Sequence, residues 1–145
     1  MRLFRRMTET DGSSPVSWLH LALASFHTGN FDDAIRYAGK VVEMRYAAAD
    51  MLGLQACAHA RAGRMEQARA IFEDLEDRAQ RGEHVAPHTF ALIHVGFGNS
   101  DLAVDWLERA FEQRTFVAGY IAVEPFWDSL RGHPRFQALV QRLHL

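Results

Sequence analysis

Histidine is the side chain of this 145-residue sequence that is best suited to metal binding or proton transfer near neutral pH, and there are eight of them. His20 and His27 are seven residues apart, so on a helix they share a face but lie about 10 Å apart along the axis, too far to bind one ion. His84 and His88 have i,i+4 spacing, but Pro87 is expected to begin the helix and to leave His84 outside it. The spacing therefore predicts no metal site, and we expect no cofactor.

Nucleophilic and phosphate-binding patterns are equally weak. Cys57 is the only cysteine, so it cannot form an internal disulfide. On a helix, Cys57 and His59 would point about 200° away from each other, which excludes a nucleophile–base pair and favours a small buried cysteine. The stretch Gly96-x-Gly98 follows a helical pattern rather than a strand and is not accompanied by a lysine, so it indicates a helix end. We expect no enzymatic activity.

Composition narrows the class of protein. With 48% apolar and 23% charged residues, the chain is typical of one globular domain. A net charge of -2 gives no overall positive field for nucleic acid. No apolar run approaches the ~20 residues needed to cross a bilayer. We expect a bacterial, cytoplasmic protein whose residues 1–14, including the basic cluster at Arg2, Arg5 and Arg6, form a tail.

A glycine followed five residues later by an alanine occurs three times, at intervals of 34 and 35 residues. A mostly apolar segment precedes each glycine, and a second helical pattern follows it. Internal repetition at this period is typical of helical repeat proteins. Apolar spacing predicts helices near 16–28, 31–44, 49–62, 65–81, 87–97 and 100–113. The three copies begin Trp18-x2-Leu21-Ala22, Leu52-x2-Gln55-Ala56 and Pro87-x2-Phe90-Ala91, and continue Gly29-Asn30-Phe31-x2-Ala34, Gly63-Arg64-Met65-x2-Ala68 and Gly98-Asn99-Ser100-x2-Ala103.

These copies resemble the tetratricopeptide repeat, a 34-residue helix-turn-helix. The resemblance covers about residues 15 to 114 and implies an all-α fold of three antiparallel helix pairs, 15–48, 49–83 and 84–114, in a right-handed superhelix (an α-solenoid). Two departures stand out. The proline that often closes a repeat is missing at Tyr46 and Gln80, and Ser25, His59 and His94 replace the usual tyrosine.

The repeated residue types have physical roles. Alanines are expected where the two helices of a pair cross, because close contact needs small side chains: Ala22 with Ala34, Ala56 with Ala68, and Ala91 with Ala103. Each repeat glycine is expected in the left-handed conformation that ends a helix. Carboxylates in the first turn of each second helix suit the helix dipole.

Residues 115–145 are expected to cap the array, with Pro134 in the first turn of a last helix that buries Phe136 and Leu139. Residues 84–145 also resemble the C-terminal tetratricopeptide tails of bacterial multidomain regulators. The matching stretches are Gly98-Asn99, Trp106-Leu107-Glu108-Arg109-Ala110, Leu130-Arg131 and Pro134-Arg135-Phe136. Such regulators append DNA-binding, kinase or cyclase domains, for which this chain has no room. The sequence leaves open whether it acts alone or as a detached tail.

The first helix is apolar almost all round, which predicts an interaction surface. Its stripe of Leu19, Leu23 and Phe26 is expected to face the concave side of the array. Three occupants remain open: a partner helix or peptide, the N-terminal Leu3-Phe4 segment, or a second copy of the chain. The alternative function is a module that senses a small molecule or metal through a histidine-bearing groove. The predicted groove residues are Leu19, Leu23, Phe26, His27, Cys57, Arg61, His88 and Leu92.

Overall fold

The structure is a computed structural model that describes residues 14–46, 48–113 and 125–143. Helices account for all the regular secondary structure of these residues, and they contain no strand, so the predicted all-α class is confirmed. The expectations for the tail, for Leu3-Phe4 and for residues 114–124 lie outside the described residues. The elements are α2 (Pro15–His27), α3 (Phe31–Glu43), α4 (Ala48–Arg61), α5 (Met65–Gln80), α6 (Pro87–Phe97), α7 (Ser100–Glu112), the 3-10 helix η2 (Pro125–Leu130) and α8 (Pro134–Leu143).

The six predicted helix ranges agree with α2 to α7 to within one residue at each end. The turns explain this agreement. Gly29, Gly63 and Gly98 have φ of +83°, +85° and +79°, the left-handed conformation that was predicted. After each glycine, the next backbone N–H donates to a carbonyl five residues back, as Asn30 does to Ser25 over 2.8 Å. This pattern satisfies the last carbonyls of the helix and reverses the chain.

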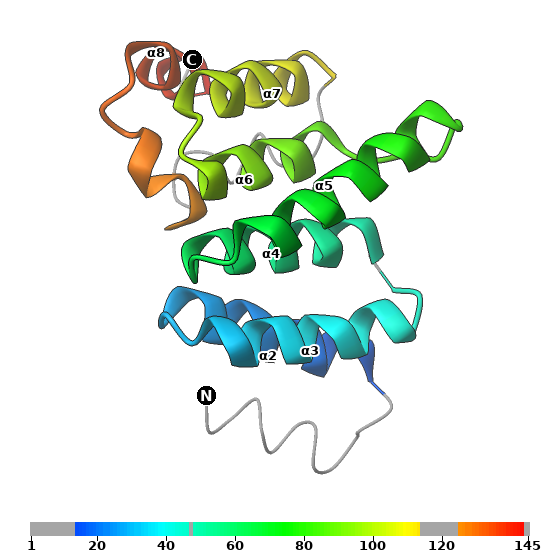
Figure 1. Cartoon of the computed structure of the whole chain (residues 1–145). Coiled ribbons are helices and arrows are strands. Elements are labelled where there is room, and N and C mark those ends of the chain that lie inside the picture. The colour runs from blue at the N-terminus through cyan, green and yellow to red at the C-terminus, as the bar shows by residue number, and fades with distance from the viewer. Residues whose placement is uncertain (1–13, 47, 114–124, 144–145) are drawn as a thin grey trace.

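Each of α2, α4 and α6 turns back into the helix that follows it and packs against it. The helices are stacked from α2 and α3 at one end to α7 and α8 at the other (Figure 1). The six alanines predicted at the helix crossings are all fully buried. Small side chains at these positions let the paired helices approach closely.

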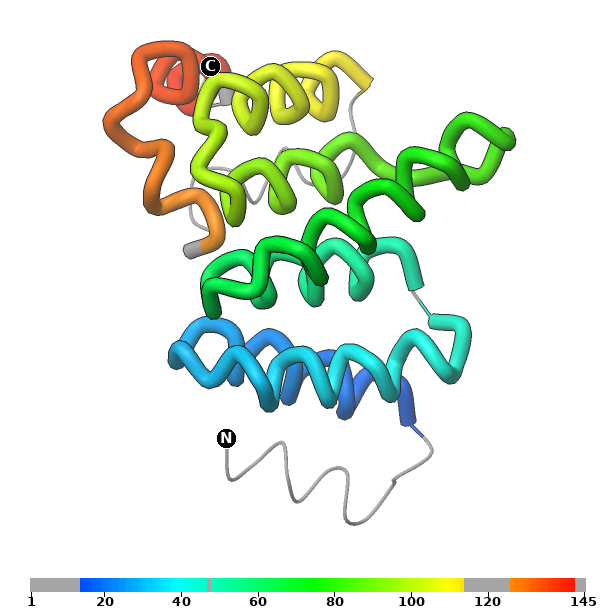
Figure 2. Tube along the Cα trace, viewed as in Figure 1, coloured from blue at the N-terminus to red at the C-terminus, as the bar shows by residue number. Residues whose placement is uncertain are grey.

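Successive pairs are not joined in the same way. Between the first and second pairs, α4 packs against α3, whereas between the second and third pairs α4 packs against α6. Helix α5 rises away from α4 along its length and its far end projects beyond the stack (Figure 2), so α5 packs only weakly against α6. Helix α4 therefore lies at the centre of the molecule, and α2 has its main packing with α3 alone among the described elements.

Glycines bring α4 and α6 into close contact at two levels. A Cβ built on Gly53 would lie 2.7 Å from Cγ2 of Thr89, closer than atoms can approach. A Cβ on Gly96 would lie 3.0 Å from the Cα of Cys57. Because 53 faces 89 and 57 faces 96, the two helices run parallel. Backbone contact of this kind leaves no room for a ligand between them.

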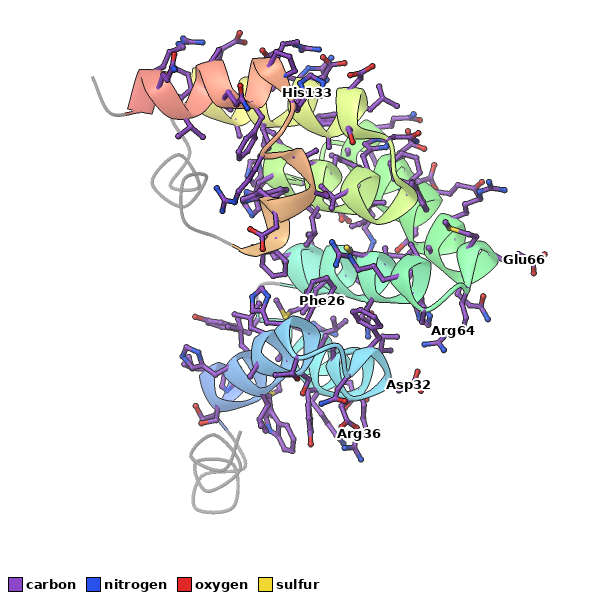
Figure 3. The ribbon with its side chains drawn as sticks, turned by 90° about the vertical axis from the view of Figure 1, so that its left-hand side faces the viewer. Phe26, Asp32, Arg36, Arg64, Glu66 and His133 are labelled. Atoms are coloured by element: carbon purple, nitrogen blue, oxygen red, sulfur yellow. The ribbon has the colours of Figure 1, made fainter. Side chains whose placement is uncertain are left out.

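The C-terminal elements cover α6 and α7, as the predicted cap would. Trp127, Leu130, Phe136 and Leu139 are buried in the same core cluster as α7. Ion pairs fix α8 from outside: Arg135 contacts both Asp105 and Glu108 of α7. His133, at the start of α8 (Figure 3), lies 2.7 Å from Asp101.

Within the described segments, no helix combines the length and the apolar character needed to cross a lipid bilayer. The longest of them, α5, has 16 residues and is rich in charged side chains.

Candidate functional site

Helix α2 carries no charged residue between Pro15 and His27 and lies with α3 at the N-terminal end of the described stack (Figure 1). Only five of its 13 residues are buried: Ser17, Leu21, Ala22, Ser25 and Phe26. Val16 is 41% exposed and His27 is exposed, while Leu19, His20 and Leu23 are half-buried. Because these positions follow helical spacing, they form one continuous surface, which we call the α2 stripe.

The opposite end of the stack differs in chemistry. The outer face of α8 exposes Arg135, Gln137, Gln141 and Arg142. Helical arrays need polar outer faces at their ends, because the last helix has no neighbour to bury an apolar one. The C-terminal end meets this requirement with charged and amide side chains, and the α2 stripe does not.

Phe26 does not belong to the open part of the predicted stripe, because it is only 4% exposed. Its ring lies 5.6 Å from that of Phe31 and 5.1 Å from that of Phe126, and the guanidinium of Arg61 lies 5.5 Å over it. Figure 3 places Phe26 where α2 faces α4. Among the described residues, the chain's own η2 covers Phe26, through Phe126.

Cys57 and Leu92 also lie in the core rather than on an open groove. Cys57 is fully buried where α4 contacts α6, and Leu92 is 8% exposed and belongs to the same core cluster. Burial raises the pKa of the Cys57 thiol to about 12, so the thiol is neutral and unreactive at neutral pH. This agrees with the small buried cysteine expected from the sequence.

His27, Arg61 and His88, the polar residues of the predicted groove, do not lie at the same end of their helices. His27 and Arg61 end α2 and α4, whereas His88 is in the first turn of α6. There, Nε2 of His88 lies 3.2 Å from Oδ1 of Asp50, which also accepts a 2.8 Å hydrogen bond from Thr89. Burial acts to raise the pKa of Asp50, but these hydrogen bonds outweigh it and hold the pKa below its ordinary value. His88 thus joins α6 to α4.

The described segments give little support for a metal-binding or catalytic site. They bring no three His, Cys, Asp or Glu side chains together as a metal site would require. His59, in the place of a repeat tyrosine, accepts a 3.1 Å hydrogen bond at Nδ1 from Nε of Arg64, and Arg64 also pairs with Asp32 over 2.6 Å (Figure 3). This network joins the α4–α5 turn to the start of α3, which is a structural role.

Sequence reasoning missed Phe126. Glu124-Pro125-Phe126-Trp127 has no helical period that would place it, and only its contact with α2 reveals its role. Comparison with known protein families, with curated proteins and with solved structures gave no match.

Proposed function

We propose that this chain is a tetratricopeptide-like interaction module, three stacked helix pairs with a C-terminal cap, that binds another polypeptide through the α2 stripe. The observation that carries the proposal is the absence of charge from the helix that begins the described stack. A terminal helix whose leucines are only partly buried, and which carries no charged residue, favours association. The repeat glycines and crossing alanines support the tetratricopeptide-like architecture.

The preferred occupant is a helix or peptide that packs along α2, with a second copy of this chain as the rival. From Val16 to His27 the stripe is about 16 Å long, which matches three turns of a partner helix. Leu19 and Leu23 supply the apolar contact, and His20 and His27 border it with polar groups. Recognition of this kind places apolar anchors of the partner at i, i+3, i+4 and i+7.

Sensing of a small molecule or metal is the weaker alternative. It would use the predicted histidine groove, and the described residues provide no set of three metal-binding side chains there. Binding of a polypeptide is therefore the function that we prefer.

The test is Leu23→Asp, with Leu19→Asp as a second variant. A carboxylate in the stripe should lower partner capture or self-association at least tenfold, because an unpaired charge would have to be desolvated in the interface. Cross-linking, light scattering and pull-down of the native protein measure both kinds of association. Phe26→Asp is unsuitable, since Phe26 is buried and its replacement would disturb the fold.

Leu102→Asp is the matched control, because Leu102 is a leucine that is 45% exposed on α7, away from α2. All three variants should keep the far-UV circular dichroism of the parent chain. The proposal fails if both α2 variants keep the oligomeric state and the captured partners of the parent protein.

A further inference from the structure

One arginine side chain joins the first helix pair to the second. Nη2 of Arg64, the residue before α5, lies 2.6 Å from Oδ1 of Asp32, and Nε of Arg64 donates a 3.1 Å hydrogen bond to Nδ1 of His59. Asp32 is in the first turn of α3, and His59 is in the last turn of α4. A guanidinium is a rigid planar group, so the hydrogen bond to His59 also fixes the direction in which Arg64 reaches Asp32. Figure 3 places Arg64 and Asp32 beside each other where the two pairs meet.

The backbone of the α4–α5 turn presents Arg64 to His59. The N–H of Arg64 donates to the carbonyl of His59 over 2.8 Å, so these two residues are joined by both a backbone and a side-chain hydrogen bond. The same backbone bond occurs in the third repeat, between Asn99 and His94. There an asparagine stands in place of the arginine, and Nδ1 of His94 has no hydrogen-bond partner among the described residues. The third repeat therefore has the histidine without the arginine contact.

The side-chain hydrogen bond requires a neutral His59. Arginine has N–H donors and no acceptor, so Nδ1 of His59 must be the unprotonated ring nitrogen, and Nε2 carries the hydrogen. A second proton on the ring would occupy Nδ1. The ring would then offer Arg64 no acceptor, and its positive charge would face the guanidinium. Proton uptake by His59 therefore changes the contact with Arg64 from attraction to repulsion.

The surroundings of His59 set the pH at which it binds a proton. Burial lowers the pKa of His59 below 6.5, the charge of Arg64 lowers it further, and the charge of Asp32 acts in the opposite direction. The link that these three residues form is therefore complete above pH 6.5, and acid opposes it. Other charged or titratable side chains lie on the adjoining parts of the helices that pack around the end of α4: Asp33 and Arg36 of α3, Arg61 of α4, Glu66 of α5 and His94 of α6.

We propose that His59, Arg64 and Asp32 form a proton-sensitive link between the first and second helix pairs, which holds while His59 is neutral and weakens when His59 binds a proton. The pair of Arg64 with Asp32 has little strength alone, because Asp32 is 85% exposed and water and salt screen its charge. Loss of the His59 hydrogen bond loosens the α4–α5 turn and its attachment to the start of α3. The two pairs stay together, since α3 packs broadly against α4. The link acts on the stability of this junction and does not depend on binding at the α2 stripe.

The first measurement is the titration of His59 in the full-length chain, followed by the NMR signals of the histidine rings. The pKa of His59 should lie below 6.5 in the parent chain. Arg64→Met should raise this pKa, because it removes a positive charge and the donor to Nδ1, and Asp32→Asn should lower it, because it removes a negative charge. The pKa of His94 should be the same in both variants, which makes His94 the internal control. A His59 pKa at or above 6.5, or one that Arg64→Met leaves unchanged, overturns the proposal.

The second measurement is amide hydrogen exchange at the α4–α5 turn, residues 60–66, compared between neutral pH and one pH unit below the measured pKa of His59. After correction for the intrinsic exchange rate, protection of the turn in the parent chain should be about threefold or more lower in acid, because a hydrogen bond of the folded state is lost. His59→Gln keeps a side-chain acceptor that does not titrate, so its turn should keep its protection at both pH values. Arg64→Met lacks the link at either pH and should show a smaller acid response than the parent.

His94→Phe is the matched control, because it removes the buried histidine at the equivalent position of the third repeat and leaves the link intact. Its α4–α5 turn should respond to acid as the turn of the parent chain does. Equal protection of the parent turn at the two pH values overturns the proposal, as does an acid response in the folded His59 or Arg64 variant that equals that of the parent. Neither experiment involves the leucines of the α2 stripe, so failure of the Leu23→Asp test leaves these results interpretable on their own.

Discussion

His94 is an ionisable side chain placed in an apolar environment. It is 7% exposed and lies against the rings of Phe72 and Phe97, 5.2 Å and 6.1 Å away between centroids. The sequence placed it where a repeat tyrosine would pack, and this core position is confirmed. Burial lowers the pKa of His94 below its ordinary value of 6.5, because the charged ring would lose its hydration.

This burial predicts a pH dependence of stability. Between the lowered folded-state pKa and 6.5, the unfolded chain binds more protons than the folded chain, so acid favours unfolding. The stabilisation from neutral His94 is complete above pH 6.5 and is lost as pH falls below it. His94→Phe should therefore reduce the drop in melting temperature between pH 7 and pH 5. A parent and a variant with the same drop would contradict this. His59, whose pKa burial also lowers, is expected to contribute part of the remaining slope.

The absence of a side chain at Gly53 allows α4 to lie close to α6. An added Cβ would meet Cγ2 of Thr89 at 2.7 Å and the carbonyl oxygen of Thr89 at 3.5 Å. Gly53→Ala should thus destabilise the fold by about 1–3 kcal/mol, because two backbones must move apart.

Gly39, in the middle of α3, is its control. A Cβ there would lie 3.4 Å from Nε2 of Gln55, the end of a movable side chain, so Gly39→Ala should be neutral or stabilise by up to about 1 kcal/mol through helix propensity. Urea titration gives both free energies of unfolding. Equal effects of the two substitutions would mean that α4 and α6 are less tightly packed than described.

At the scale of elements, α8 acts as a cap by two means. Its inner face buries Phe136 and Leu139, each 1% exposed, and its outer face is polar. The exposed ion pairs of Arg135 orient the helix but are screened by salt, so burial supplies most of the stabilisation.

Phe136→Ala should accordingly cost about 3–5 kcal/mol of unfolding free energy, because it removes a buried ring and leaves a cavity. Gln137→Ala, at the next position on the exposed side, should change stability by less than about 0.5 kcal/mol. Thermal or urea unfolding compares the two variants. If both variants lost similarly little unfolding free energy, the cap would add little to the stability of the fold.

At the scale of the whole molecule, the two ends of the stack have opposite surfaces. One end is closed by α8 with charged and amide side chains, and the other presents the uncharged α2 stripe. Association through one end only is expected to give a complex of defined size rather than a filament, because the capped end offers no complementary apolar face. The ring contact between Phe26 of α2 and Phe126 of η2 joins the first helix to the C-terminal elements.

The sequence by itself determined the helices and their turns. Local rules suffice for these, because the glycine at each helix end, the crossing alanines and the apolar period act over a few residues. It also placed His94 and Cys57 in the interior.

Only the tertiary structure decided which of the apolar side chains on α2 remain open. Phe26 looks like Leu19 and Leu23 in the helical pattern, but its cover comes from Phe126, 100 residues further along the chain. The close approach of α4 to α6 through Gly53 and Gly96 likewise removed Cys57 and Leu92 from the predicted groove. Such contacts depend on how segments that are distant in the sequence pack together, and helical periodicity contains no information about that packing.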